Sequence, residues 1–223
     1  KIIIGGNFNF TSFNGTLTDR ITRLNTNGIV DTSFNAGMGA NFAVLTTSIQ
    51  SDGKIIIGGA FLFYNEASIN RIARLNTNGT LDNTFNSGTG ADGIVRTTKI
   101  QSDGKIIIGG DFTSYDGTPR NGIARLNTNG SLDTTFNPGT GANGPILTSS
   151  IQNDGKIIIG GAFNTFNGTI TNKIARLNAN GTIDTTFNPG TELNNSVLTT
   201  SIQSDGKIIV GSASYINLTG NDN

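Results

Sequence analysis

Residues 101–110 read QSDGKIIIGG, and nearly the same ten letters return through the whole chain of 223 residues. The lysine of this stretch recurs at positions 1, 54, 105, 156 and 207, so its spacing is 53 residues once and 51 residues three times. Self-similarity at such a period is the signature of a tandem array of structural units.

Each period contains four short segments that suit β-strands, which we call a, b, c and d. In the third copy they cover residues 95–101, 105–112, 123–127 and 131–136. Segments a and b are joined by Ser-Asp-Gly, and segments c and d by Thr-Asn-Gly. Both connections suit a type I turn whose glycine adopts the left-handed conformation in a β-bulge. The sequence therefore predicts two hairpins in every repeat.

This turn type also predicts the register of the second hairpin. It places Leu126 opposite Leu132 and Arg125 opposite Asp133, which gives one apolar and one charged cross-strand pair. We expect the charged pair to be structural, because a site seldom needs the same pair once in every repeat. The pair recurs as Arg23 with Asp31, Arg74 with Asp82, Arg125 with Asp133, and Arg176 with Asp184.

Segment b carries apolar side chains at successive positions, so both faces of this strand must be covered. We expect Ile107 and its equivalents Ile3, Ile56 and Ile158 to lie in central strands that are covered on both faces. The glycine pair that follows leaves space for a close approach of another backbone. The second glycines of these pairs are Gly6, Gly59, Gly110 and Gly161.

Four antiparallel segments in about 51 residues match the blade of a β-propeller, with strand a innermost and strand d outermost. A linear β-solenoid is the competing architecture, but its repeats are usually shorter. The predicted fold is thus an all-β propeller of tandem four-stranded antiparallel blades. The predicted units are 1–42 without an inner strand, 43–93, 94–144, 145–195 and the start of a fifth blade at 196–223.

The strand inventory predicts an open arc rather than a closed ring. The first copy has no segment a, whereas residues 197–203 and 207–210 supply a fifth segment a and a surplus segment b. We expect an arc of a larger propeller of six or seven blades, whose exposed edges a partner or further repeats must cover. Because copies are cut at both ends, we infer a portion of a longer chain.

The connections from segment b to segment c differ most between copies, and each retains an aromatic residue. The aromatic predicts a connection that folds back onto the core. The variation predicts that any ligand selectivity arises here and in the d-to-a crossovers, the glycine-rich connections that join one repeat to the next. The equivalent aromatic of the first copy is Phe13. The candidate ligand residues are Tyr64, Glu66, Tyr115, Asp116, Phe166 and Asn167.

Composition argues against several function classes. Fifteen basic residues balance fifteen acidic ones, so no broad field favours nucleic acid or an anionic membrane surface. No apolar run approaches the roughly 20 residues that span a bilayer, so we expect no membrane insertion. Cysteine is absent, which removes disulfides, thiolate nucleophiles and sulfur-bound metals.

No catalytic constellation stands out. Histidine is absent, so a Ser or Thr nucleophile lacks its usual base. The loop carboxylates have no spacing that favours a glycosidase pair; they are Glu66, Asp92, Asp111, Asp116 and Glu192. Turns such as residues 127–130 resemble calcium loops in outline but carry neutral amides in place of carboxylates. We expect no enzyme and no cofactor, and calcium is kept as an alternative.

The core Q-x-D-G-K-I-x-x-G-G-x-F, followed by I-A-R-L-N-x-x-G-x-x-D-x-x-F-N, resembles the delta-60 repeat family of β-propellers, a domain of unknown function. The resemblance covers four periods and the start of a fifth. It implies a propeller of secreted or surface-attached bacterial proteins and implies no catalytic residue. Ser212 departs from it by replacing the second glycine, and residues 216–223 no longer follow the repeat.

Two function classes follow. The first is a structural or protein-interaction module of a secreted or cell-surface protein, whose partner is another protein or further repeats. The second is a carbohydrate-binding propeller of an adhesin, in which repeated shallow sites give avidity for a glycan. The chain has no Trp and only three Tyr to serve as sugar platforms, which favours the first class.

Overall fold

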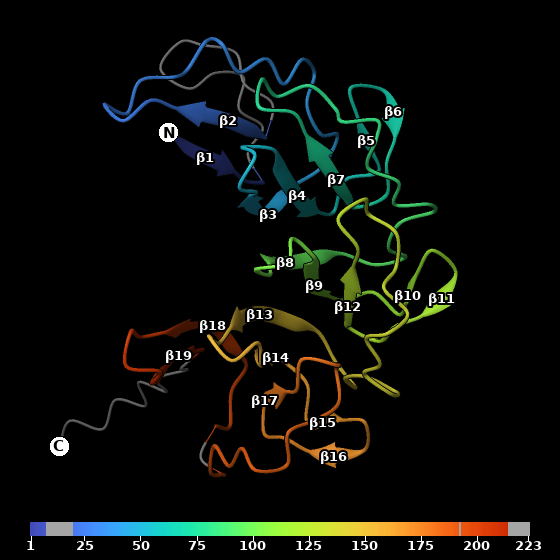
Figure 1. Ribbon diagram of the computed structural model, residues 1–223, viewed down its shortest axis with the longest axis vertical. Coiled ribbons are helices and arrows are strands. Elements are labelled where there is room, and N and C mark those ends of the chain that lie inside the picture. Colours follow the sequence, from blue (N-terminus) through green and yellow to red (C-terminus); the bar gives the residue numbers. More distant parts are fainter. Residues whose placement is uncertain (8–19, 192, 214–223) are drawn as a thin grey trace, which may run out of the picture.

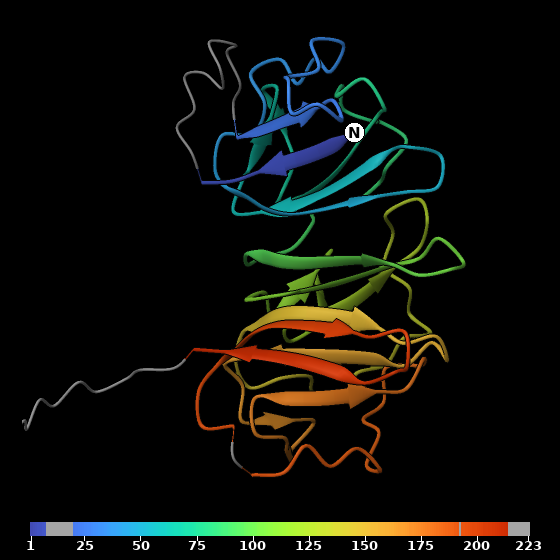
Figure 2. The same ribbon diagram turned by 90° about the vertical axis from the view of Figure 1, so that its left-hand side faces the viewer.

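The structure is a computed structural model that describes residues 1–7, 20–191 and 193–213. The described residues form short antiparallel strands and turns, with no helix among them. Five sheets follow one another in an arc, with the sheet of β1 (Ile2–Gly5) and β2 (Ile21–Leu24) at one end (Figure 1). Figure 2 shows successive sheets stacked face to face.

Each blade has an inner, a middle and an outer strand, which correspond to segments a, b and c. The inner strands are β3 (Val44–Ile49), β8 (Val95–Ile100), β13 (Ile146–Ile151) and β18 (Val197–Ile202). Besides β1, the middle strands are β4 (Ile55–Gly59), β9 (Ile106–Gly110), β14 (Ile157–Gly161) and β19 (Ile208–Ser212). Besides β2, the outer strands are β7 (Ile72–Leu75), β12 (Ile123–Leu126) and β17 (Ile174–Leu177).

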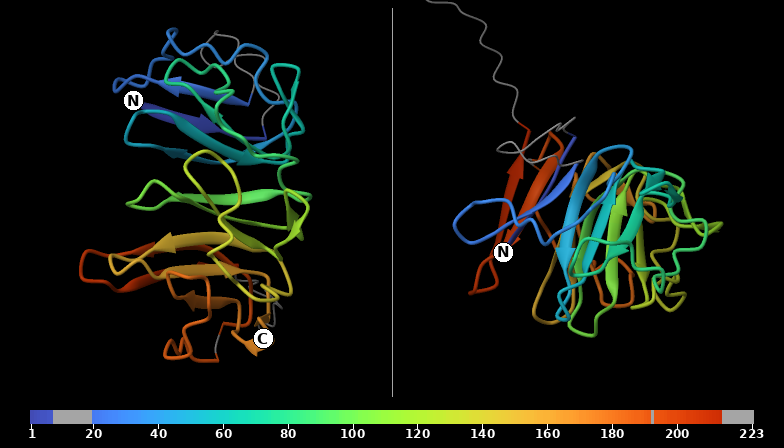
Figure 3. Two further views of the ribbon diagram at one scale, coloured as in Figure 1. Left: turned by 45° about the vertical axis from the view of Figure 1, so that its right-hand side comes forward. Right: turned by 90° about the horizontal axis from the view of Figure 1, so that it is seen from above.

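The three complete sheets have the orders β3-β4-β7, β8-β9-β12 and β13-β14-β17. The end sheets are the pairs β1-β2 and β18-β19. Because β18 pairs with β19 and β1 pairs with β2, the two ends of the arc are not joined to each other. Figure 3 shows the unclosed series of sheets from two further directions. The all-β propeller architecture and the open arc are therefore confirmed.

The triple isoleucines lie where the sequence predicts. Ile107 is paired on one side with Lys99 and on the other with Arg125, and its side chain is completely buried. Ile56 and Ile158 are equally buried. Ile3 is only half-buried, which corrects the prediction for the first copy, because β1 has a sheet partner on one side only.

The second glycine of each pair does stand at a close backbone approach. A Cβ atom on Gly110 would lie 2.0 Å from the main-chain oxygen of Ile94, and one on Gly161 would lie 2.1 Å from that of Pro145. Gly59 meets the oxygen of Ala43 in the same way, at 2.0 Å. In the first copy, the oxygen of Gly6 accepts a hydrogen bond from the Val44 amide at 3.2 Å.

The second hairpin has the predicted register but a shorter last strand. Leu126 is bridged to Leu132, and the Asp133 amide donates to the Arg125 oxygen at 2.8 Å. The chain then bends, because the Asp133 carboxylate accepts a hydrogen bond from the Thr135 amide at 3.0 Å. Segment d is thus a single bridge beside a three-stranded sheet instead of a full fourth strand.

The b-to-c connections form small hairpins that fold back onto the core, as predicted. Their strands are β5 (Phe63–Tyr64), β6 (Ala67–Ser68), β10 (Ser114–Tyr115), β11 (Thr118–Pro119), β15 (Thr165–Phe166) and β16 (Thr169–Ile170). The rings of Tyr64, Tyr115 and Phe166 are completely buried. The equivalent Phe13 lies outside the described residues.

Hydroxyl groups connect the inner strands of neighbouring blades. The side-chain oxygens of Thr46 and Thr98 are 3.0 Å apart, and those of Thr97 and Ser149 are 2.9 Å apart. The contact repeats between Thr148 and Thr200 at 3.2 Å. The inner strands therefore pack against one another through a regular ladder, as expected for the strands nearest the axis of a propeller.

Candidate functional site

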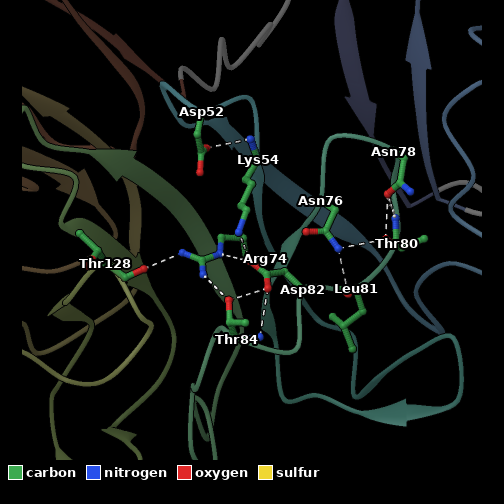
Figure 4. Close-up of polar contacts among 10 residues, drawn as sticks. All are labelled: Asp52, Lys54, Arg74, Asn76, Asn78, Thr80, Leu81, Asp82, Thr84 and Thr128. Atoms are coloured by element: carbon green, nitrogen blue, oxygen red, sulfur yellow. Dashed lines mark hydrogen bonds and ion pairs between the residues drawn. The ribbon is translucent and has the colours of Figure 1, made fainter.

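The repeated Arg and Asp meet, and the lysine that opens segment b joins them. In blade 2, the Asp82 Oδ2 atom accepts hydrogen bonds from Arg74 Nε at 2.7 Å and Lys54 Nζ at 2.8 Å (Figure 4). The Asp82 Oδ1 atom accepts from both the amide and the hydroxyl of Thr84. We call this arrangement the Lys–Asp–Arg cluster. It recurs around Asp31, Asp133 and Asp184.

The electrostatics of this cluster keep its carboxylate ionised. Burial would raise the pKa of Asp82, but hydrogen bonds from Lys54, Thr84 and Arg74 outweigh it and hold the pKa well below its ordinary value. The pKa of Asp133 is lowered by the same balance of causes. Four donated hydrogen bonds fill the acceptor sites of the carboxylate, so the cluster has no capacity left to work as a base.

The arginine of the cluster also reaches the next blade. Arg74 Nη1 donates to the main-chain oxygen of Thr128 at 2.6 Å, in the c-to-d turn of blade 3 (Figure 4). The guanidinium lies over the ring of Phe85, with 5.1 Å between Cζ and the ring centre. The Phe85 ring in turn lies against Gly130 of the same turn. These contacts support a structural role for the cluster, in which it connects neighbouring blades.

The lysine was not among the residues that the sequence marked for this cluster. Lys54 and Asp82 are 28 residues apart, and the same separation recurs for Lys105 with Asp133. The separation is 30 residues in the first copy, so the signal available in the sequence is that all four copies carry both residues.

Three of the six candidate ligand residues are unsuited to that role. Tyr64, Tyr115 and Phe166 are completely buried, and the Tyr115 hydroxyl donates to the Gly130 oxygen at 2.8 Å. Burial also raises the pKa of Tyr64 and Tyr115 above its ordinary value. The prediction of ligand contact is corrected for these rings, because they fill the space between the small hairpin and the blade.

The other three candidates are exposed, and two of them brace the loops. The Asp116 carboxylate accepts from the Thr89 amide at 2.9 Å, and the Asn167 side chain accepts from the Thr140 amide at 3.1 Å. Each of these hydrogen bonds connects the small hairpin of a blade to the crossover that leads into that blade from the preceding one. Glu66 instead lines an open hollow with Arg20 and Phe63.

The loop carboxylates do not combine into one site. The Asp92 carboxylate accepts hydrogen bonds from the amides of Thr113 and Ser114. Burial would raise the pKa of Asp92, but the hydrogen bonds outweigh it and lower the pKa to about 2. Asp111 is bound by Arg96, and Glu192 lies outside the described residues. In the part of the chain that the structure describes, no group of three or more Asp, Glu, His or Cys side chains could hold a metal ion.

A pocket of about 320 Å³ opens in blade 3, on the side of the arc where the b-to-c connections and crossovers lie, which we call the loop side. Gly110, Asp111, Phe112, Gly122 and Ala142 are among its lining residues. We call it the third-blade pocket.

Asp111, a lining residue of the third-blade pocket, forms a charge pair with Arg96. Arg96 donates from Nε and Nη2 to the two carboxylate oxygens of Asp111, both at 2.6 Å. This bidentate contact raises the pKa of Arg96.

Residues at and beside the third-blade pocket depart from the repeat. Where blade 3 has Arg96, the other blades have leucine, and where it has Asp111, blades 2 and 4 have alanine. Where it has Gly122, the other blades have arginine or lysine. The third copy is thus distinguished on the loop side by both its charge and its shape.

No described helix is long and apolar enough to cross a membrane.

The comparisons with known proteins agree with this architecture. A family model described as "Domain of unknown function (DUF5122) beta-propeller" matches residues 1–34, 50–85, 101–136 and 152–187, more than half of the chain. No curated protein sequence matches the chain.

Two solved structures show the same fold. The WD40 β-propeller domain of Doa1 has a TM-score of 0.52 and 20% identity, over 77% of this chain and 48% of that one. The gluconolactonase XC5397 from Xanthomonas campestris has a TM-score of 0.52 and 12% identity, over 86% of this chain and 62% of that one. The chain therefore spans about half of the first structure and less than two thirds of the second.

Proposed function

This chain belongs to the β-propeller family described as a domain of unknown function (DUF5122), and on that premise we propose that it is a non-catalytic protein-interaction module. The observation that carries the proposal is the contrast between the repeated contacts and the loop side. The Lys–Asp–Arg clusters are occupied in bonds within and between blades. The third-blade pocket, in contrast, includes two lining residues, Asp111 and Gly122, that the other copies do not carry at the equivalent positions.

The strands of this array carry nearly the same residues in each copy, because equivalent positions meet equivalent neighbours. Three residues of blade 3 depart from this regularity. Asp111 and Gly122 line the pocket, and Arg96 binds Asp111. Binding residues are commonly carried by loops on a rigid scaffold, and the loop side of this arc has that arrangement. We therefore place the interaction surface on the loop side, centred on blade 3.

A second partner surface is the outer side of blade 4. In blades 2 and 3, the cluster arginine is covered by the turn of the next blade, and the Arg125 side chain is 10% exposed. The Arg176 side chain is 21% exposed and lines a hollow of about 340 Å³ with Phe187 and Asn188. We propose that the c-to-d turn of a further repeat occupies this hollow. Placement in a secreted or cell-surface bacterial protein is part of the same proposal and rests on the family resemblance.

The interaction role is tested with a library of phage-displayed random peptides, panned against the immobilised chain beside an array of glycans. We expect enriched peptides whose binding is weakened by changes on the loop side, such as Gly122→Arg. The matched control is Lys99→Ser, which changes an exposed inner-strand residue to the serine found in blades 2 and 4. Binding to glycans without any enriched peptide would replace the proposal with the carbohydrate-binding alternative.

A further inference from the structure

One position in every repeat precedes segment c in a left-handed backbone conformation. It is occupied by Arg20, Arg71, Gly122 and Lys173, with φ angles of 55°, 66°, 74° and 70°. A positive φ is uncommon for residues other than glycine, so the arginines and lysine here need a compensating contact. In the first two copies, such a contact is present.

The two arginines bind the crossover that leads to the following blade. Arg20 Nη1 donates to the main-chain oxygen of Ala40 at 2.8 Å, and Arg71 Nη1 donates to that of Ala91 at 2.7 Å. The residue equivalent to these alanines in the next crossover is Ala142. Twice within the chain, therefore, a guanidinium group is the hydrogen-bond donor to the main-chain oxygen at this position of the crossover.

In blade 3 the same place has no side chain, because Gly122 stands where the arginines stand. Gly122 and Ala142 both line the third-blade pocket. The volume of about 320 Å³ lies within the range of about 300–1,000 Å³ that is typical of ligand sites. The buried ring of Phe112 adds an apolar wall, which suits the methylene stem of an arginine side chain.

The pocket also offers a carboxylate that can accept hydrogen bonds. Asp111 is a lining residue, and Arg96 donates one hydrogen bond to each oxygen of its carboxylate. An ionised carboxylate has about four acceptor sites, so about two are left for a further donor. Blades 2 and 4 carry alanine in place of Asp111, so they lack this acceptor, and blade 3 has both the acceptor and the pocket.

We infer that the third-blade pocket receives a guanidinium group from outside, namely an arginine side chain of a protein partner. The group takes the place that Arg20 and Arg71 fill in their own copies, with the Ala142 oxygen and the Asp111 carboxylate as acceptors. This inference rests on the proposed interaction function and specifies the chemical group that is recognised.

The first test titrates Nα-acetyl-arginine amide into the full chain and follows backbone amide shifts by NMR. We expect the shifts to centre on Asp111, Gly122 and Ala142. The matching citrulline amide has the same shape without the charge, and it should bind about tenfold more weakly because charge-assisted hydrogen bonds are lost.

The second test fills or opens the pocket by substitutions that the repeat already contains. Gly122→Arg should fold normally, since a Cβ atom there would lie 3.4 Å from its nearest neighbour, Ile146 Cδ1, and the variant should bind at least about tenfold more weakly. The reverse change, Arg71→Gly, should open a pocket in blade 2 that keeps the Ala91 oxygen but lacks the Asp111 carboxylate, so it should add a second, weaker arginine site per chain. Melting temperatures of both variants check that the fold is kept.

Equal binding of the citrulline and arginine amides, or undiminished binding to Gly122→Arg, would overturn the inference. If arginine-free peptides from the library bind the loop side and still bind Gly122→Arg, the proposed interaction function is supported and the guanidinium inference is wrong. If neither peptides nor the arginine amide bind, both proposals are wrong.

Discussion

Arg125 Nη1 donates a hydrogen bond to the main-chain oxygen of Ala179 at 2.6 Å, although the two residues are 54 positions apart and belong to different blades. The same guanidinium binds Asp133 within its own blade at 2.7 Å. One side chain therefore contributes both to the stability of a blade and to its attachment to the next. The stability of such an array is a sum of repeat terms and neighbour terms, and Arg125 belongs to both.

Arg125→Ala is expected to lower the free energy of unfolding by about 2 kcal/mol or more, because Asp133 stays buried with one cationic partner fewer. Arg176→Ala is the matched control, since Arg176 binds Asp184 equivalently but makes no hydrogen bond to a following turn within the described residues. It should cost about 1 kcal/mol less. Urea titrations of both variants measure the difference, and equal costs would contradict the role of Arg125 between blades.

The melting temperature should fall in acid. Asp82 and Asp133 have a folded-state pKa below the ordinary value of 3.8, so the unfolded chain binds more protons as the pH approaches that value. Their contribution to stability is complete above about pH 5 and is lost as the pH falls through about 4 towards the folded-state pKa. Calorimetry across this range measures it. Asp133→Asn should flatten the slope, and an unchanged slope in this variant would argue against the assignment.

Ile107→Ala should lower the free energy of unfolding by about 2–5 kcal/mol, because the side chain is completely buried in a central strand. Ile209 occupies the equivalent position of the fifth copy and is 54% exposed. Ile209→Ala should therefore change stability by only about 0.5 kcal/mol. A loss below about 1 kcal/mol for Ile107→Ala in urea titration would refute the sandwiched strand.

Tyr115→Phe should cost about 1–3 kcal/mol, because the main-chain oxygen of Gly130 loses its buried hydroxyl donor. Blade 4 supplies the reverse experiment, since Phe166 occupies the equivalent buried position. Phe166→Tyr is expected to raise the melting temperature by giving the Gly181 oxygen the same donor. The melting temperatures of the two variants should thus shift in opposite directions, and shifts in the same direction would contradict this interpretation.

Turn chemistry makes the hairpin register predictable from the sequence. The three-residue connection at 128–130 places Leu126 opposite Leu132, and the structure has this pair. The early end of segment d depends on a competing local contact, in which Asp133 binds the Thr135 amide and bends the chain. Strand-like residue types alone do not reveal which contact the backbone adopts.

The candidate site was less predictable, because it depends on which residues meet in space. Tyr115 lies in a variable loop and so resembles a surface residue, yet the hairpin of β10 and β11 turns its ring into the core. The third-blade pocket combines Asp111, Gly122 and Ala142 from three segments. A comparison of the copies would have marked Gly122 as exceptional, but only the fold shows that Ala142 faces the same space.

The contact between Arg125 and the next blade has a direction, and that direction has a consequence for assembly. Every blade offers an arginine on one side and a turn on the other, so the contact joins unlike surfaces. The turn residues 26–28 of the first blade are exposed, and in blade 4 the Arg176 side chain lines a hollow with Phe187 and Asn188. An interface built from this contact is therefore heterologous, with an arginine on one surface and a turn on the other. A contact of this kind can be repeated from blade to blade, and the rotation per blade decides between a closed ring and a helical filament.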